Sequence, residues 1–247
     1  MPRVLISDEL SPNATEIFES RGLKVDRKIG LTLEQLLSEI ESYDGLAIRS
    51  ATKVTAEVIA KAKNLKVVGR AGIGVDNIAV DAASAAGVVV MNTPFGNAVT
   101  TAEHAISMIC SLAREITTAD RSTQAGKWEK SSFMGTELTG KNLGIVGCGN
   151  IGSIVANRAQ GLKMRVLAFD PYLSEERAVE LGVRKVDEET LFSQSDFITL
   201  HTPLTDSTKG LVNADSIMKM KKGVRIINCA RGGLIVETDL KTARENG

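Results

Sequence analysis

The stretch Asn142–Tyr172, NLGIVGCGNIGSIVANRAQGLKMRVLAFDPY, decides the fold of this 247-residue chain. A short apolar run leads into Gly147, Gly149 and Gly152, which are spaced as G-x-G-x-x-G. A helical pattern follows the glycines, and a second apolar run then ends in Asp170. Strand, glycine turn, helix and strand in this order predict a βαβ unit with two parallel strands.

The three glycines have separate roles in such a unit. Gly147 permits the tight turn, Gly149 lets the backbone approach a pyrophosphate, and Gly152 lets the helix pack closely on the strand. Asp170 stands at the spacing of the acid that binds the ribose hydroxyls, and a carboxylate there repels a 2′-phosphate. The alternative is an ordinary βαβ turn with an incidental aspartate, but the ordered elements argue against it. We therefore predict NAD as the cofactor.

The same alternation of strands and helices extends outward in both directions. A Pro-Phe-Gly-Asn break at 94–97 separates two such series, and a long helical run of about 98–123 follows the break. We predict an α/β protein with two doubly wound parallel-sheet domains, Rossmann-like or flavodoxin-like, and a cleft between them. The predicted domains are 1–93 and 94–247, with the long helix between them. The strands are expected at 3–8, 45–50, 66–72, 87–92, 142–147, 164–170, 195–203 and 224–233.

The composition excludes several classes of protein. Thirty basic residues balance thirty acidic ones, which gives no indication of a nucleic-acid or membrane partner. No apolar run reaches membrane-spanning length and the N-terminus has no signal-peptide pattern, so we expect a cytosolic protein. Cys110, Cys148 and Cys229 lie in apolar runs without C-x-x-C spacing, which indicates small buried side chains rather than disulfides or a metal site.

Arginines follow three of the predicted strands. In open α/β sheets, ligands bind outside the carboxyl ends of the strands, and Arg49, Arg70 and Arg231 are expected there. Arginine binds carboxylate or phosphate through a bidentate fork, and glycines at 72 and 74 expose N–H groups suited to an anion. The pattern predicts a small anionic substrate next to the nicotinamide, and hydride transfer as the chemistry. The alternative for each arginine is a solvated surface side chain.

Several stretches resemble the D-2-hydroxyacid dehydrogenases, and the likeness runs from Val4 to the end of the chain. "FMGTEL" (133–138) and "RSATKVTAEVI" (49–59) resemble more narrowly the phosphoglycerate dehydrogenases of that family. The other stretches are "VGRAGIGVDN" (68–77), "VMNTPFGN" (90–97), "GKWEKSSFMGTELTGKNLGIVGCGNIG" (126–152), "DFITLHTPLTDSTKGLVN" (196–213) and "KKGVRIINCARGG" (221–233).

The resemblance implies oxidation of 3-phospho-D-glycerate to 3-phosphohydroxypyruvate with NAD, the first step of L-serine biosynthesis, by a homodimer or homotetramer. It implies that 1–93 belong to the substrate-binding domain and that Arg231 is the catalytic arginine. The implied cofactor contacts are Ile73, Gly147, Gly149, Asn150, Ile151, Gly152, Asp170, Thr202, Cys229, Ala230 and Arg231. The implied substrate contacts are Arg49, Ser50, Arg70, Gly74, Asn97 and Arg231.

The sequence departs from the family pattern at some positions. Ile73 stands where the phosphoglycerate enzymes have threonine, and Val236 stands in place of an acid. The family's catalytic histidine and its glutamate partner correspond to positions downstream of Gly247, while His104 is expected mid-helix and His201 at a strand end. We therefore expect negligible turnover from this chain by itself. The alternative functions are a hydroxypyruvate or glyoxylate reductase, and an NAD-sensing module without catalysis.

Overall fold

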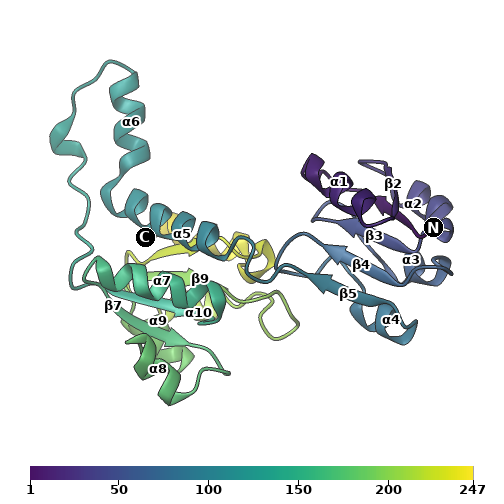
Figure 1. Ribbon diagram of the computed structural model, residues 1–247. Coiled ribbons are helices and arrows are strands. Elements are labelled where there is room, and N and C mark those ends of the chain that lie inside the picture. The colour runs from purple at the N-terminus through teal and green to yellow at the C-terminus, as the bar shows by residue number, and fades with distance from the viewer. Residues whose placement is uncertain (247) are drawn as a thin grey trace. The chain divides into compact units, whose positions relative to one another are not determined.

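The structure is a computed structural model that describes residues 1–246. It divides into two compact units, the first Met1–Asn97 and the second beginning at Ala98. Each unit is an α/β layer structure built on one parallel sheet (Figure 1). The prediction of two doubly wound parallel sheets is confirmed.

The first unit contains five parallel strands in the order β2-β1-β3-β4-β5. Numbered within the unit, this is the 2-1-3-4-5 order of flavodoxin-like folds, with its switch point between β1 and β3. The strands are β1 (Arg3–Ile6), β2 (Lys24–Arg27), β3 (Gly45–Ile48), β4 (Val67–Arg70) and β5 (Val89–Asn92). The helices are α1 (Pro12–Ser20), α2 (Leu33–Glu39), η1 (Ile40–Ser42), α3 (Ala56–Lys61) and α4 (Val80–Ala85).

Local sequence signals set several of these elements. Thr32 begins α2 with a capping box, because its hydroxyl accepts from the amide of Gln35 and the Gln35 side chain accepts from the amide of Thr32. The central strand β3 is buried along its whole length. The edge strand β2, KVDR, has no fully buried residue, and its charged composition hides it from a search for apolar runs.

The second unit also contains five parallel strands, in the order β10-β9-β6-β7-β8. Numbered within the unit and read from the other edge, this is 3-2-1-4-5, the strand order of dinucleotide-binding sheets. The strands are β6 (Asn142–Val146), β7 (Arg165–Phe169), β8 (Arg184–Lys185), β9 (Phe197–Leu200) and β10 (Arg225–Asn228). The remaining elements are α5 (Ala98–Arg114), α6 (Ile116–Gln124), η2 (Lys130–Ser132), α7 (Asn150–Gly161), α8 (Glu175–Leu181), α9 (Glu188–Gln194), α10 (Ala214–Met218), η3 (Gly232–Leu234) and α11 (Glu237–Asn246).

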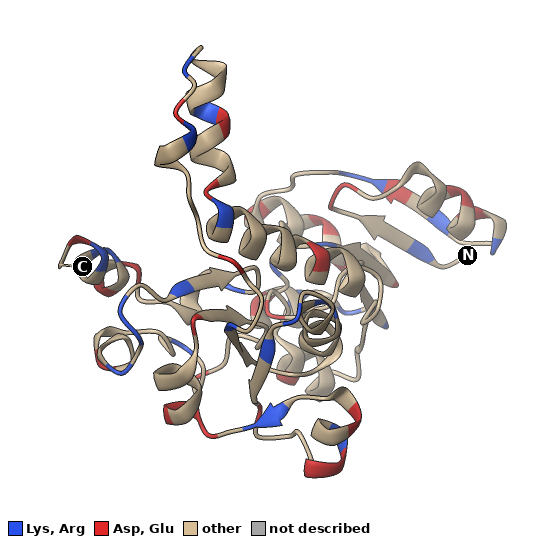
Figure 2. Ribbon diagram, turned by 90° about the vertical axis from the view of Figure 1, so that its left-hand side faces the viewer, with Lys and Arg blue, Asp and Glu red and all other residues tan. Residues whose placement is uncertain are grey.

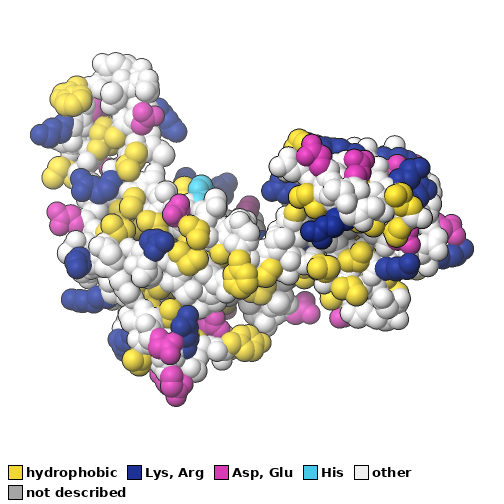
Figure 3. Space-filling model, viewed as in Figure 1, with side chains coloured by type: hydrophobic (Ala, Val, Ile, Leu, Met, Phe, Trp, Pro, Cys, Tyr) yellow, Lys and Arg dark blue, Asp and Glu magenta, His cyan; other side chains and the backbone are white. Residues whose placement is uncertain are grey.

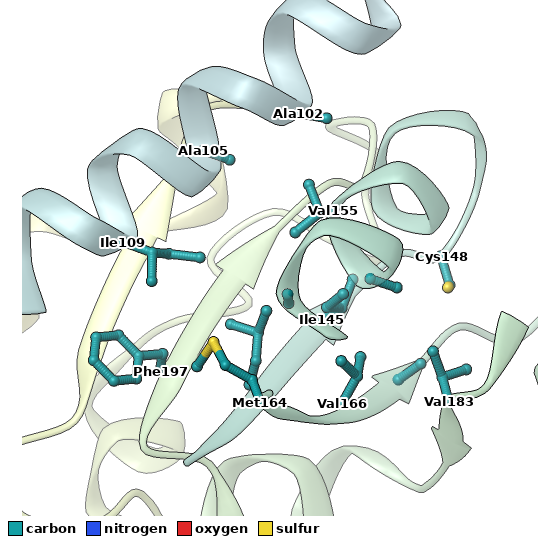
Figure 4. Packing of buried hydrophobic residues seen from close by; sticks show 14 of the residues in the cluster. Ala102, Ala105, Ile109, Ile145, Cys148, Val155, Met164, Val166, Val183 and Phe197 are labelled. Atoms are coloured by element: carbon teal, nitrogen blue, oxygen red, sulfur yellow. The ribbon is translucent and has the colours of Figure 1, made fainter. Parts of the chain in front are cut away.

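The core of the second unit lies between its sheet and the helices α5 and α7. Ala102, Ala105 and Ile109 of α5 are fully buried, and they point towards Val155 of α7 and Ile145 of β6 (Figure 4). Small residues at every third or fourth position let α5 approach α7 closely. This packing fixes α7, and therefore the glycine loop that precedes it.

The prediction of one long helix at about 98–123 is wrong. It is divided into α5 and α6 at Glu115, whose φ of 55° is left-handed. The break leaves the carbonyl of Ala113 to accept a hydrogen bond from the amide of Thr136, at 2.6 Å. The β-branched run that starts at Ile116 also lowers helix propensity.

Charged residues of both signs occur in both units. Basic and acidic residues are interspersed along the helices and strands (Figure 2), in agreement with thirty residues of each sign. No helix among residues 1–246 is both long and apolar enough to span a membrane.

Candidate cofactor and substrate sites

The glycine loop lies between β6 and α7, at the switch point of the second sheet. Gly147 has a φ of 88°, which glycine adopts without strain. A Cβ on Gly147 would lie 2.8 Å from Cγ2 of Thr202 and 2.9 Å from the carbonyl of His201. The turn after β6 therefore packs directly against the end of β9.

The first turn of α7 is held close to this turn by Gly152. A Cβ on Gly152 would lie 2.1 Å from the carbonyl oxygen of Gly147, so only glycine fits. Gly149 is the N-cap of α7 and has no side chain that could accept from the first-turn amides. A Cβ on Gly149 would meet no protein atom within 4 Å, so its surface is open to an approaching anion. Asn150 and Ile151 begin the helix there.

Asp170 follows β7 and is tied to the glycine loop. One carboxylate oxygen accepts from the amide of Cys148 at 2.8 Å, and the other accepts from the amide of Tyr172 at 2.8 Å. The residue is half-buried, in contrast to a fully buried carboxylate. The structure thus brings the predicted acid to the glycine loop, as a ribose ligand requires.

The end of β9 places two buried polar atoms beside the loop. Nδ1 of His201 and Oγ1 of Thr202 have no hydrogen-bond partner among the described residues. Nε2 of His201 is 3.0 Å from Oγ1 of Thr199. Burial lowers the pKa of His201 from 6.5 to about 4, so the ring is neutral at pH 7. The orphaned hydroxyl of Thr202 is a group that a bound ligand would satisfy.

Arg231 lies at the carboxyl end of β10, in a turn shaped by Asn228. The Asn228 side chain donates to the carbonyl of Arg231 at 2.8 Å and accepts from the amide of Ala230 at 3.0 Å. A cavity of about 430 Å³ opens here, and Cys229, Ala230, Arg231 and Glu237 are among its lining residues. The sequence did not single out Asn228 as the residue that holds this turn.

The two cysteines near these strand ends are not reactive groups. Burial, with a contribution from Asp170, raises the pKa of Cys148 to about 11. Burial also raises the pKa of Cys229 above its ordinary value. Both thiols therefore stay protonated at neutral pH.

The first unit has its own cavity of about 300 Å³ at the carboxyl ends of its strands. Arg49, Gly72 and Asn97 line it, together with Ser11 and Glu9. Arg70 is buried beneath it: its Nε donates to the carbonyl of Arg49 at 3.2 Å, and a Cβ on Gly72 would lie 2.6 Å from its Nη1. The glycine at 72 makes room for this guanidinium.

The other predicted residues of the first unit lie nearby in the chain. Ser50 is exposed next to Arg49, and Ile73 and Gly74 are half-buried in the turn after β4. The carbonyl of Ile73 accepts from the side chain of Asn92 at 2.7 Å. Sequence reasoning missed Asp8, whose position directly after an apolar run was the available signal.

The fold and the geometry of the second unit define a dinucleotide-binding α/β protein. The open glycine cradle, the helix N-terminus, the tethered Asp170 and the orphaned hydroxyl of Thr202 fit an NAD molecule. Comparison with known proteins is more specific. Residues 106–247 match the NAD binding domain of the D-isomer specific 2-hydroxyacid dehydrogenases, and the chain belongs to this family.

Individual relatives cover nearly the whole chain. A D-3-phosphoglycerate dehydrogenase of Archaeoglobus fulgidus is 48% identical over 99% of this chain and 46% of its own length. The human D-3-phosphoglycerate dehydrogenase is 49% identical over the same shares. The chain therefore spans about half the length of the curated relatives it matches. Among solved structures, a D-lactate dehydrogenase from Aquifex aeolicus complexed with NAD and lactic acid has a TM-score of 0.88 at 26% identity, and the match covers 99% of this chain and 74% of that one.

Proposed function

We propose that this chain is part of an NAD-dependent dehydrogenase that oxidises 3-phospho-D-glycerate to 3-phosphohydroxypyruvate, in serine biosynthesis. The observation that carries the proposal is the 48% to 49% identity to D-3-phosphoglycerate dehydrogenases across both units. The D-lactate dehydrogenase named above has only 26% identity to the chain. Because the matches to D-3-phosphoglycerate dehydrogenases cover 99% of the chain, their higher identity includes the first unit, where the substrate contacts are proposed.

In this proposal, different parts of the dinucleotide bind at the ends of different strands. The amides at the start of α7 bind the pyrophosphate, Asp170 accepts from the ribose hydroxyls, and Thr202 donates to the cofactor. Ile73, Gly147, Gly149, Asn150, Ile151, Gly152, Cys229, Ala230 and Arg231 complete the proposed set. NAD, when bound, accepts the hydride from C2 of the substrate.

The proposed substrate contacts include three arginines. Arg231 binds the substrate carboxylate and stabilises the negative charge that develops on the C2 oxygen. Arg49, Ser50, Arg70, Gly74 and Asn97 bind the remaining anionic group. The guanidinium of Arg231 stays protonated and cannot accept the hydroxyl proton. His201 is half-buried, its pKa is lowered to about 4, and its Nε2 lies 3.0 Å from Oγ1 of Thr199, so we assign proton transfer to the catalytic histidine of the family pattern and not to His201.

A substrate panel tests this function. The protein in its full natural length should reduce NAD rapidly with 3-phosphoglycerate, and slowly with glycerate or lactate. Equal rates on all three would refute the phosphorylated substrate, and faster reduction of hydroxypyruvate or glyoxylate by NADH would favour a sister reductase. The 247-residue chain should bind NAD without measurable turnover, because general acid–base assistance is typically worth about a hundred- to ten-thousand-fold in rate.

We also propose that the enzyme is a homodimer formed through the segment 116–137, which we call the arm. Its helix α6 extends away from the sheet of its own unit (Figure 1), and hydrophobic side chains are exposed over it (Figure 3). Ile116, Trp128 and Met134 are 51%, 84% and 77% exposed. Aromatic residues and methionine are enriched in interfaces, and identical arms can meet about a twofold axis.

The molar mass in solution tests the arm. The double variant Trp128→Ser, Met134→Ser should be a monomer by light scattering, whereas Tyr172→Ser, which removes a 96% exposed aromatic elsewhere in the second unit, should leave the mass unchanged. A dimeric double variant would contradict the assignment.

Three thiols without disulfides among the described residues fit the cytosolic location that we propose.

A further inference from the structure

The residues Arg49–Thr52, which we call the 49–52 loop, follow β3 at the switch point between β1 and β3. Arg49, Ser50 and Ala51 are exposed, so apolar packing does not hold the loop in place. Thr52 is buried. Arg49 is one of the residues that line the cavity of the first unit, and its position depends on what fixes the backbone of this loop.

Asp8 binds the two N–H groups at the ends of the loop. Its carboxylate accepts from the amide of Arg49 at 2.6 Å and from the amide of Thr52 at 3.0 Å. It also accepts from the hydroxyl of Thr52 at 2.6 Å. Asp8 is only 4% exposed and follows β1, the strand on the other side of the switch point.

Asn77 binds the two carbonyl groups at the ends of the same loop. Its Nδ2 donates to the carbonyl of Arg49 at 2.8 Å and to the carbonyl of Thr52 at 2.7 Å. The two hydrogens of one amide nitrogen are thereby used in full. Together, Asp8 and Asn77 bind both main-chain polar groups of the first and the last residue of the loop.

The hydroxyl hydrogens of this network have one consistent assignment. The hydrogen of Thr52 goes to Asp8, so Thr52 Oγ1 can only accept from Ser7 Oγ, at 2.9 Å. Ser7 is fully buried. Asp8 forms no ion pair within residues 1–246, and its charge is therefore stabilised by N–H and O–H donors.

We propose that Asp8 and Asn77 are positioning residues that fix the 49–52 loop, so that the Arg49 guanidinium is presented to an anionic group of the substrate. The inference rests on the proposed function for the identity of that substrate. A loop whose ends are already held by these contacts, and by Arg70 Nε at the carbonyl of Arg49, loses little further entropy when the ligand binds. Neither residue touches the substrate in this assignment; both act through Arg49.

The variant Asp8→Asn tests the proposal, because its amide keeps the size of the carboxylate but offers one acceptor oxygen instead of two. Hydrogen exchange of the 247-residue chain should show faster exchange at the amides of Arg49 and Thr52, with the central strands unchanged. Calorimetric titration should show 3-phosphoglycerate binding weakened by about 10- to 100-fold, as expected for a displaced positioning group. The affinity for NAD, which the second unit binds, should stay within about twofold of wild type.

Matched variants separate positioning from charge and folding. Asp81→Asn removes a charge from an exposed position in the same unit and should change neither readout. Thr52→Ser keeps the hydroxyl and should retain the wild-type affinity, whereas Thr52→Val should weaken 3-phosphoglycerate binding. The threonine pair also decides the question if Asp8→Asn fails to fold.

The outcomes distinguish the inference from the proposed function. Faster amide exchange with unchanged 3-phosphoglycerate affinity would overturn the positioning role, as would unchanged exchange at both amides. If the wild-type chain binds lactate or glycerate but not 3-phosphoglycerate, the proposed substrate fails, and the same comparison is made with the acid that binds. If it binds none of these acids, the role in substrate binding is overturned as well.

Discussion

Replacing Gly152 with alanine tests whether the close approach of α7 to the glycine loop determines cofactor binding. The added Cβ would lie 2.1 Å from the carbonyl oxygen of Gly147, where ordinary contacts begin at 3.4 Å. The helix or the loop must therefore move by about 1 Å or more. The same Cβ would also lie 3.2 Å from Cγ2 of Ile145, so movement towards β6 is blocked.

The structure gives the size of the expected effect on stability and binding. Overpacking in a tight site costs about 1–3 kcal/mol, and the higher helix propensity of alanine offsets up to about 1 kcal/mol. A net loss of about 1–2 kcal/mol corresponds to a melting temperature lower by roughly 2–8 °C in a chain of this size. Displacement of the first-turn amides by about 1 Å should weaken NAD binding by about 100-fold.

The assay is thermal unfolding of the 247-residue chain together with calorimetric titration of NAD. The matched control is Gly161→Ala at the other end of the same helix, where a Cβ would meet nothing within 4 Å. That variant should bind NAD normally and unfold at the same or a slightly higher temperature. NAD affinity of Gly152→Ala within about threefold of wild type would refute the reasoning, because the loop and helix would then be free to separate without consequence.

Three further predictions concern the second unit. Asp170→Asn should weaken NAD binding by about tenfold, because a ribose acceptor is lost and the hydrogen bond to the Cys148 amide is perturbed. The same variant should raise the affinity for NADP relative to NAD, and an unchanged ratio of the two dissociation constants would contradict the role of the charge. The pKa of His201 is lowered to about 4 in the folded protein, so stability is highest above pH 6.5 and falls as the pH drops from 6.5 towards 4, where the unfolded state binds the proton first. In urea titrations across this range, the free energy of unfolding should fall by about 2–3 kcal/mol in wild type and by less in His201→Gln. Lys163 has a φ of 61°, so Lys163→Gly should raise the free energy of unfolding by about 0.5–1 kcal/mol in denaturant titrations, and a decrease would show that its side chain has a stabilising contact.

The central parts of both sheets are predictable from the sequence because their strands are buried on both faces. β3 has no polar side chain and β9 has only Thr199, and each strand is buried over its whole length. The edges are not predictable in this way. β2 carries three charged residues out of four, and β8 has only two residues, so neither forms an apolar run.

The helices α8 and α9 could be predicted from the sequence by capping rules, but not by apolar periodicity. Ser174 begins α8 and accepts from the amide of Arg177, and Gly182 ends it at a φ of 65°. Asp187 begins α9 in the same way. The break at Glu115 had no such signal, because glutamate is not a residue that favours a left-handed φ, and the hydrogen bond from the Thr136 amide to the Ala113 carbonyl joins segments that are apart in the sequence.

In the candidate site, the sequence pattern locates two aspartates, and their burial has to be learned from the structure. "VLISD" (4–8) and "VLAFD" (166–170) are both apolar runs that end in aspartate, and the glycine motif before the second run is what marks its aspartate as a candidate ligand. Each carboxylate accepts from two main-chain amides near a switch point: Asp8 from Arg49 and Thr52, and Asp170 from Cys148 and Tyr172.

Exposure separates the functions of these two aspartates. Asp8 is 4% exposed and its oxygens are occupied by the protein, so it can only hold a loop. Asp170 is half-buried, so it can hold the glycine loop and also accept from a ligand. A carboxylate placed at the end of a parallel strand thus organises backbone in both units, and we expect it to serve as a cofactor ligand only where the fold does not bury it fully.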